Sequence, residues 1–244
     1  ASVTSIGEDA FQNSGLTEAT IYSDQLGKPG FPTSGGSDKT FGGNTGVNVL
    51  VYQLFSGTGT LTGGWNNNSG NSIAIIEGYS TIGSDAFNGS NMKSVIIGAS
   101  VETIQEYAFY NTTSLTSVTF EAGSQLRTID PYAFSFSALT SIIIPASVTT
   151  INEYAFDNAS ALSSVTFGSD GFDSQLTSIQ QYTFAHLPKG LGSITIPPKV
   201  ESIAETAFWW NGISEARVNI DSLGKPGFPS KTGPKGVLGN YPAV

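Results

Sequence analysis

Residues 101–120 read VETIQEYAFYNTTSLTSVTF, and residues 148–167 repeat this pattern as VTTINEYAFDNASALSSVTF. An Ile stands four residues before the Ala of an Ala-Phe pair, and a segment of alternating apolar and polar residues follows, which is typical of a β-strand. The same signature recurs at Ala10, Ala86, Ala133 and Ala207, with Thr183 as a variant in place of Ala. Self-similarity at a short period indicates a repeat protein.

The spacing of these strands predicts a solenoid. Aligned on their central apolar residue, the strands are 22 to 29 residues apart, which is the range of leucine-rich repeats. One such unit cannot bury its apolar side chains alone, so the units must stack and share one core. We expect Leu115, Val118 and Phe120 to point into that core. Ile104 and Phe109 should fill it from the opposite wall. The predicted central residues are Ala19, Val47, Ile73, Val95, Val118, Ile142, Val165, Ile194 and Ala216.

The pattern V-x-x-I-x-x-x-A-F-x-x-x-x-x-L-x-S-V-x-I/F resembles the BspA-like leucine-rich repeat, also called the Treponema pallidum type. The match is good across residues 79–220 and clear across 1–21, but it is weak across 22–78 and 221–244. The resemblance implies a right-handed, β-rich leucine-rich-repeat solenoid of the α/β class with about nine stacked rungs. A parallel β-sheet should form the concave face, and irregular or short helical segments should form the other wall.

We interpret residues 1–244 as a single solenoid domain. Residues 1–21 are its first repeat, 79–220 its regular repeats and 221–244 a C-terminal loop or cap. Residues 22–78 are two degenerate repeats with long loops, and the alternative is a small inserted hairpin. Pro145 and Pro197 come directly after predicted strands, where a missing N–H ends strand pairing at little cost.

Composition and charge argue against several classes of function. A net charge of −9 is unlike the basic footprint of a nucleic-acid-binding protein. No apolar run approaches the roughly 18–20 residues that span a bilayer, so we expect no membrane insertion. The chain has no Cys and one His, His186, which argues against zinc sites and His-based catalysis. Asp170 and Asp173 are too few for a calcium loop. We therefore expect no catalytic residues, no cofactor and no metal.

The family resemblance implies a non-enzymatic, adhesin-like binding module that is secreted or displayed at the cell surface. Its partner would be a protein or a glycan on another cell or in the host matrix. The alternative is a self-assembling extracellular scaffold or filament subunit that stacks head to tail.

The positions beside each central strand residue should face outward and form a candidate binding surface. The position before it is Ser in six consecutive rungs, beginning at Ser72, and the position after it is often Thr. The alternative is that Ser belongs to the repeat consensus, because crowding there excludes large side chains. The candidate residues are Ser94, Ser117, Thr119, Ser141, Ser164, Thr166, Ser193, Thr195 and Arg217.

Aromatic residues supply further candidates. Trp209 and Trp210 follow the core residue Phe208, so at least one of them should be exposed, and together with Trp65 they are the expected contact anchors. The residues Tyr107, Tyr132, Tyr154 and Tyr182 hold equivalent positions and should stack as a ladder. The sequons at Asn67, Asn88, Asn111 and Asn158 are glycosylation candidates, although Asn also suits the turn after Ala-Phe.

A longer repeat suggests an assembly joint. DQLGKPGFP at residues 24–32 returns as DSLGKPGFP at residues 221–229. Head-to-tail stacking would bring a basic C-terminal segment against an acidic start, and unprotected strand edges invite such pairing. In this hypothesis Arg217, Lys225 and Lys231 face Glu8, Asp9 and Glu18 of a neighbouring copy. The alternative is that the GKPGFP loop folds back and caps its own final rung.

Overall fold

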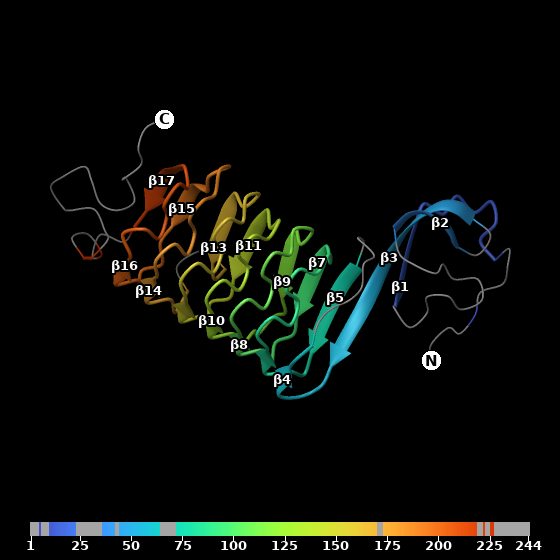
Figure 1. Ribbon diagram of the computed structural model, residues 1–244, viewed down its shortest axis with the longest axis horizontal. Coiled ribbons are helices and arrows are strands. Elements are labelled where there is room, and N and C mark those ends of the chain that lie inside the picture. The colour runs from blue at the N-terminus through green and yellow to red at the C-terminus, as the bar shows by residue number, and fades with distance from the viewer. Residues whose placement is uncertain are drawn as a thin grey trace.

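The computed structural model describes residues 5, 10–22, 36–41, 44–63, 72–169, 173–218, 222 and 225–226. Most of them form a solenoid in which each turn of the chain lies against the next (Figure 1). We call its three sides the front wall, the second wall and the turn wall. The leucine-rich-repeat solenoid that the repeat predicts is confirmed.

The front wall consists of the strands β1 (Glu18–Tyr22), β3 (Asn44–Ser56), β5 (Ser72–Glu77), β7 (Ser94–Ile97), β9 (Ser117–Phe120), β11 (Ser141–Ile144), β13 (Ser164–Phe167), β15 (Gly192–Thr195) and β17 (Ile213–Arg217). Where neighbouring front strands pair, they pair in parallel. Their side chains alternate between the core and the outer face, so Val95 and Ile97 of β7 are buried while Ser94 and Ile96 are only partly covered. This alternation is the one that the sequence predicts.

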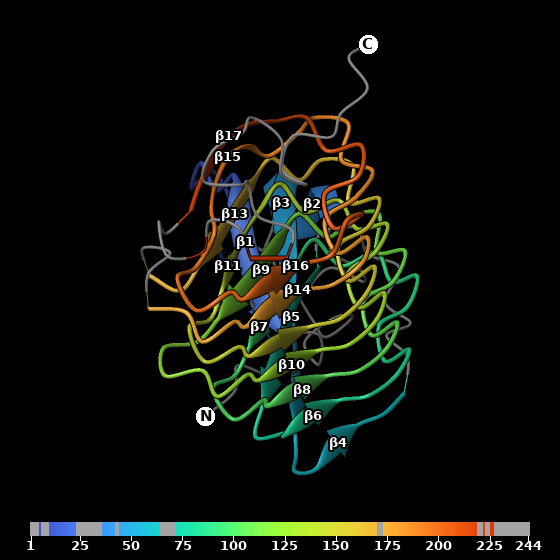
Figure 2. The ribbon, with the colours of Figure 1, turned by 90° about the vertical axis from the view of Figure 1, so that its left-hand side faces the viewer.

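The second wall is a row of two-residue strands with the sequence Thr-Ile, Ser-Ile or Thr-Leu, aligned one above another (Figure 2). They are β4 (Thr60–Leu61), β6 (Thr81–Ile82), β8 (Thr103–Ile104), β10 (Thr128–Ile129), β12 (Thr150–Ile151), β14 (Ser178–Ile179) and β16 (Ser202–Ile203). In each pair the aliphatic residue is buried and the hydroxyl residue lies toward solvent. These short pairs close the core opposite the front wall.

The turn wall contains the six turns at residues 83–89, 105–111, 130–136, 152–158, 180–186 and 204–210. Backbone hydrogen bonds join each turn to the next, as from Phe109 N to the Ala133 oxygen at 2.8 Å. Most turns place the residue before Ala, and the third residue after it, in the left-handed region; Tyr107 has φ 58° and Asn111 has φ 54°. Asn tolerates this conformation better than other residues with a side chain, which explains its use here.

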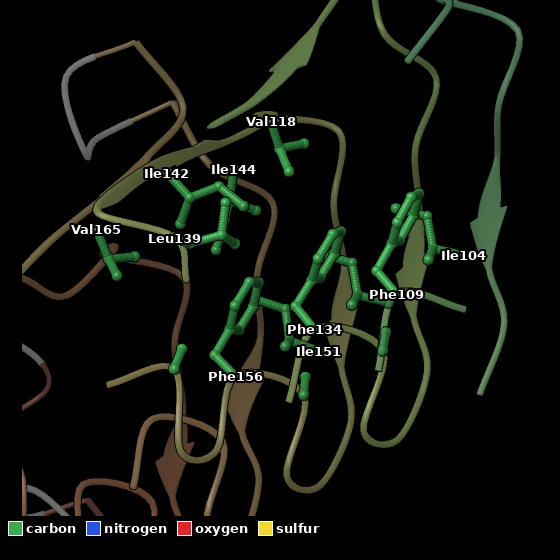
Figure 3. Packing of buried hydrophobic residues seen from close by; sticks show 14 of the residues in the cluster. Ile104, Phe109, Val118, Phe134, Leu139, Ile142, Ile144, Ile151, Phe156 and Val165 are labelled. Carbon is green, nitrogen blue, oxygen red and sulfur yellow. The ribbon is translucent and has the colours of Figure 1, made fainter. Parts of the chain in front are cut away.

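A stack of Phe rings fills the core between the walls (Figure 3). Phe87, Phe109, Phe134 and Phe156 are fully buried, and successive rings lie 5.0–5.3 Å apart with nearly parallel planes. The stack continues through Phe184 to Phe208. Leu115, Val118 and Ile104 are buried as expected, while Phe120 is half-buried. The repeated Ala leaves room for the large ring beside it, so each turn supplies one Phe to the stack.

Two details differ from the expected architecture. The front wall has nine strands, but the second wall has seven, so the described chain makes about seven complete turns. The described part of the second and turn walls contains no α-helix; it consists of turns and two-residue strands. Of the irregular or short helical segments that we expected opposite the front wall, the described chain has the irregular ones.

The predicted register is wrong in the degenerate region. Ala19 pairs with Val49, whereas Val47 pairs with Lys39 of the antiparallel strand β2 (Gly36–Phe41). Val95 pairs with Ala74, one residue beyond the predicted Ile73. Because β5 has apolar residues at consecutive positions, its sequence suits either register, and pairing with β7 decides between them.

Residues 22–78 contain features of both interpretations. Strand β3 is part of the front wall and pairs in parallel with β1 and β5, as a degenerate repeat should. Strands β2 and β3 also form an antiparallel hairpin, as the alternative requires. The division of the chain into the four proposed segments stays a prediction.

Candidate functional site

The Ser file on the front wall exists, but it is shorter than expected. Ser94 lies beside Ser117, Ser141 beside Ser164, and Ser193 beside Glu215. Ser72 is fully buried and pairs with Val51, so including it in the outward file was wrong. The one-residue shift of β5 turns Ser72 toward the core and leaves five outward serines.

The second outward file is more apolar than the sequence alignment indicates. Ile75 replaces Ala74 in this file because of the same register shift, and it lies beside Leu54 and Ile96. The exposed fraction is 45% for Leu54 and 64% for Ile143. The file runs in order through Leu54, Ile75, Ile96, Thr119, Ile143, Thr166, Thr195 and Arg217. The front wall therefore has an aliphatic end and a hydroxyl-rich end that finishes at Arg217, whose Nε donates to Glu215 Oε1 at 3.1 Å.

The front wall is interrupted twice. Its pairing runs from β1 to β9, stops before β11, resumes for β11 and β13, and stops again before β15. At intact steps, the residue that follows a strand donates its N–H to the preceding rung. Gly98 N donates to the Ile76 oxygen at 2.8 Å, and Gly168 N donates to the Ile144 oxygen at 2.8 Å. Each of these bonds is the last one between two paired front strands.

A proline occupies the equivalent position at both interruptions. Pro145 follows β11 and Pro197 follows β15, and neither has an N–H to donate. The carbonyls of Phe120 and Phe167 therefore cannot receive the bond that closes the other ladders. The sequence indicates that these prolines end pairing along their own strands. The structure shows that each also coincides with a gap between neighbouring rungs.

A groove lies at each interruption. The first has a volume of about 550 Å³ and extends from β9 and β11 into the corners at residues 121–124 and 145–147. Of the candidate residues, it is lined by Ser117, Thr119 and Ser141, with Ile143 beside them.

The second groove has a volume of about 280 Å³. It contains the candidate residues Ser164, Thr166, Ser193, Thr195 and Arg217. The structure thus brings eight of the nine front-wall candidates to two concave places, and the ninth, Ser94, lies on an intact ladder. The signal that locates the grooves is the pair of prolines rather than the serines.

The tryptophan candidates lie elsewhere. Trp209 and Trp210 belong to the turn wall, and their exposed fractions are 42% and 63%. Both are exposed, whereas the sequence required only one to be. They do not join the front-wall candidates, and Trp65 falls outside the described residues.

The predicted tyrosine ladder is present on the turn wall. Rings of Tyr107, Tyr132, Tyr154 and Tyr182 stack at centroid distances of 4.7–5.1 Å. Loss of hydration, followed by the neighbouring tyrosines, raises the pKa of Tyr132 and Tyr154 above its usual value. The packing interpretation of these residues therefore accounts for them.

The turn interpretation also accounts for two of the sequons. Asn111 and Asn158 are left-handed, with φ of 54° and 55°. Asn88 is not left-handed, and its side chain donates to Asp85 Oδ1 at 2.7 Å. Asn67 lies outside the described residues. Glycosylation of any of them stays a prediction.

The residues of the expected assembly joint are only partly described, because Glu8, Asp9 and Lys231 lie outside the described ranges. Glu18 is exposed and accepts from Asn48 Nδ2 at 3.3 Å. At the other end, Ile203 N donates to the Pro226 oxygen at 3.0 Å, next to the half-buried Lys225. Pro226 therefore contacts β16, and a capping role for residues 221–244 stays a prediction.

The described residues offer no evident metal centre. Within them, no three His, Asp or Glu side chains gather as metal ligands. Asp173 accepts from the N–H and the hydroxyl of Ser169, and Asp170 is not described. His186 Nδ1 lies 2.7 Å from Asp157 Oδ1. No helix in the described segments has the length and hydrophobicity needed to cross a membrane.

Comparison with known proteins agrees with this geometry. A solved structure shares the fold at low sequence identity, and others are similar over part of the chain. The pneumococcal vaccine antigen PcpA gives a TM-score of 0.50 at 20% identity, over 86% of this chain and 42% of that chain. A leucine-rich repeat protein from Eubacterium ventriosum gives 0.41 at 21% identity, over 67% and 56%. One from Bacteroides ovatus gives 0.38 at 19% identity, over 91% and 61%. The chain thus spans less than two thirds of each of these proteins.

No curated protein matches the sequence. The family described as the BspA type leucine rich repeat region, however, matches residues 80–214 and 171–228, with six copies. Together these ranges cover more than half of the 244 residues. The chain belongs to the BspA-type leucine-rich repeat family.

Proposed function

We propose that this protein is a non-enzymatic, adhesin-like binding module that is secreted or displayed at the cell surface. The observation that carries the proposal is the first front-wall groove, which lies at Pro145 between β9 and β11. Concave places lined by apolar surface and a few polar groups are where proteins usually bind ligands. The first groove, at about 550 Å³, is within the usual size range of such sites.

The groove chemistry suits a protein or glycan ligand. Hydroxyls of Ser117, Thr119 and Ser141 lie beside the exposed aliphatic side chain of Ile143. This combination offers hydrogen bonds and apolar contact, and Glu121, which accepts from Ala99 N, adds one carboxylate at the edge of the groove. The antigen PcpA is similar in fold, and its description as a vaccine antigen supports surface display for the present protein as well.

Binding to an array of extracellular-matrix proteins and oligosaccharides, measured by biolayer interferometry, tests the proposal. Ile143→Asp places a charge in the first groove and should weaken binding at least about tenfold, as loss of a central contact does. Leu54→Asp is the matched control, because Leu54 is exposed in the same outward file on an intact ladder. Equal binding by the wild type and Ile143→Asp would contradict a role for the first groove.

We also propose, as a second function, head-to-tail assembly into an extracellular scaffold. Glu18 is exposed on the first described front strand, and the Arg217–Glu215 pair is exposed on the last, so in this contact Arg217 would exchange Glu215 for Glu18 of a neighbouring copy. Such a contact, repeated without closing into a ring, would give filaments.

A further inference from the structure

Aromatic rings follow one another along the turn wall, away from both grooves. We call Tyr107, Tyr132, Tyr154, Tyr182, His186 and Trp210 the aromatic strip. The tyrosines stack on one another, His186 lies 6.3 Å from Tyr182, and Trp210 lies 6.4 Å from His186. The strip therefore runs across five successive turns and ends at a ring that is 63% exposed.

Packing within the chain does not explain the exposed ring of Trp210, whereas His186 is half-buried and lies against Asp157. Trp210 and His186 hold the third position after the core pair, with φ of 53° and 51°. Sister turns place Asn111, Asn158 or Gly89 there, which are residues that suit the left-handed region. A bulky ring is unfavourable in that conformation. Because Trp210 is largely exposed, burial does not compensate for it.

Phe136 is another aromatic residue at this left-handed position, in an earlier turn. It holds the same position with φ of 57°, is 43% exposed, and touches Tyr110 edge-on at 5.6 Å. Tyr110 in turn touches Tyr107 of the strip at 5.3 Å. Exposed aromatic side chains thus lie at the last turn of the strip, at Trp210, and beside its first two turns, at Phe136. A ligand would reach ring faces there that neighbouring rings do not cover.

The charges around the strip have one sign. The six turns of the turn wall contain six carboxylates and neither Lys nor Arg. Asp157, which is buried, lies against His186, and Glu153 and Glu205 are exposed in neighbouring turns. The nearest bases along the chain are Arg127, three residues before one of these turns, and Lys189, three residues after another. The carboxylates are Asp85, Glu106, Asp130, Glu153, Asp157 and Glu205.

We propose that the aromatic strip is a docking surface for a Lys- and Arg-bearing segment of another protein. A guanidinium group stacks on aromatic faces and forms charge-assisted hydrogen bonds with carboxylates, and both are present on this wall. The aliphatic stems of Lys and Arg would cover the apolar parts of Trp209 and Trp210. A neutral glycan would use the rings but not the carboxylates, so the acidic surroundings favour a basic partner.

Fluorescence anisotropy with three labelled peptides tests this assignment. The probes are a Gly-Arg repeat, a Gly-Gln repeat and a Gly-Glu repeat of equal length, and a neutral oligosaccharide serves as a fourth. We expect the Gly-Arg peptide alone to bind, and its affinity to fall as salt is raised from about 50 to 300 mM, because salt screens exposed charges. Binding of the Gly-Gln peptide or of the oligosaccharide with equal affinity, independent of salt, would overturn the proposal.

Trp210→Asn separates binding from folding. Asn is the residue of the sister turns, so this variant should keep or raise the melting temperature while losing about tenfold in affinity, the effect of removing an aromatic hot spot. Leu54→Asn is the matched control, because Leu54 is exposed, at 45%, on the front wall and lines neither groove. A lower melting temperature for Trp210→Asn would show that the ring serves the fold, and equal affinity loss in the control would show non-specific attraction. Either result would contradict the proposal that the aromatic strip is a docking surface.

Discussion

Phe134 lies in the middle of the core stack, with Phe109 at 5.0 Å on one side and Phe156 at 5.3 Å on the other. Phe134→Ala should lower the free energy of unfolding by about 3–5 kcal/mol, because the rungs on both sides prevent the cavity from collapsing. Phe11, in contrast, is 38% exposed, so Phe11→Ala should cost much less. Denaturant melts of the two variants make the comparison. Equal losses would argue against a core in which burial depends on neighbouring rungs.

The tyrosine ladder should make stability depend on alkaline pH. The pKa of Tyr132 and Tyr154 is raised in the folded protein from the ordinary 10.0, so the unfolded chain loses these protons first. Their stabilising contribution is complete below the unfolded pKa and is lost as pH rises through the folded pKa. Thermal melts between about pH 9 and 11 should therefore show a shallower decline for the Tyr132→Phe/Tyr154→Phe double variant. Tyr79→Phe, outside the ladder, should decline as the wild type does, and identical slopes for all three proteins would refute this prediction.

At the scale of single elements, Pro145 offers a direct test of how the first groove arises. Pro145→Ala supplies the N–H that β11 lacks, and the Phe120 carbonyl of β9 is the acceptor in the equivalent position. One added hydrogen bond is worth about 0.5–1.5 kcal/mol, partly offset by the greater freedom of the unfolded chain. The expected result is slower amide exchange in β11, measured by hydrogen–deuterium exchange, together with weaker ligand binding. Pro188→Ala changes an exposed loop proline and is the control.

The amide exchange of β9 and β11 in the wild type shows whether Pro145 causes the gap between them. If β9 and β11 already protect each other in the wild type, Pro145→Ala should change nothing, and the proline is not the cause of the gap. The sequence identifies both prolines and places them after strands, but not their effect on the neighbouring rung. That effect depends on which carbonyl lies opposite, and this follows from register rather than from local pattern.

At the scale of the whole molecule, removing residues 221–244 distinguishes a cap from an assembly joint. The bond from Ile203 N to the Pro226 oxygen would be lost, and the buried Ser222 would go with it. We expect a monomer that is less stable by about 1–3 kcal/mol in denaturant melts, because a capped rung becomes exposed. Sedimentation of the intact chain at low salt completes the experiment. Polymers that disappear on truncation, without loss of stability, would instead support head-to-tail assembly.

The sequence by itself determined the solenoid and the residues of its core. The Ile and the Ala-Phe pair recur at nearly constant spacing, so each repeat directs the same side chains inward whatever its neighbours are. The tyrosine ladder and the turn asparagines follow from the same local rule. These features need only a few adjacent residues to specify them, which is why reading the pattern was sufficient.

Only the tertiary structure decided the register of β5, the two gaps in the front wall and the exposure of both Trp209 and Trp210. Ile73 and Ala74 are both apolar, so the alternation of β5 permits two registers, and hydrogen bonds to β7 select the one that buries Ala74 and Ser72. The grooves likewise depend on which carbonyl lies opposite Pro145 and Pro197 in another repeat. Interactions between rungs join residues more than twenty positions apart, and a local pattern does not encode that pairing.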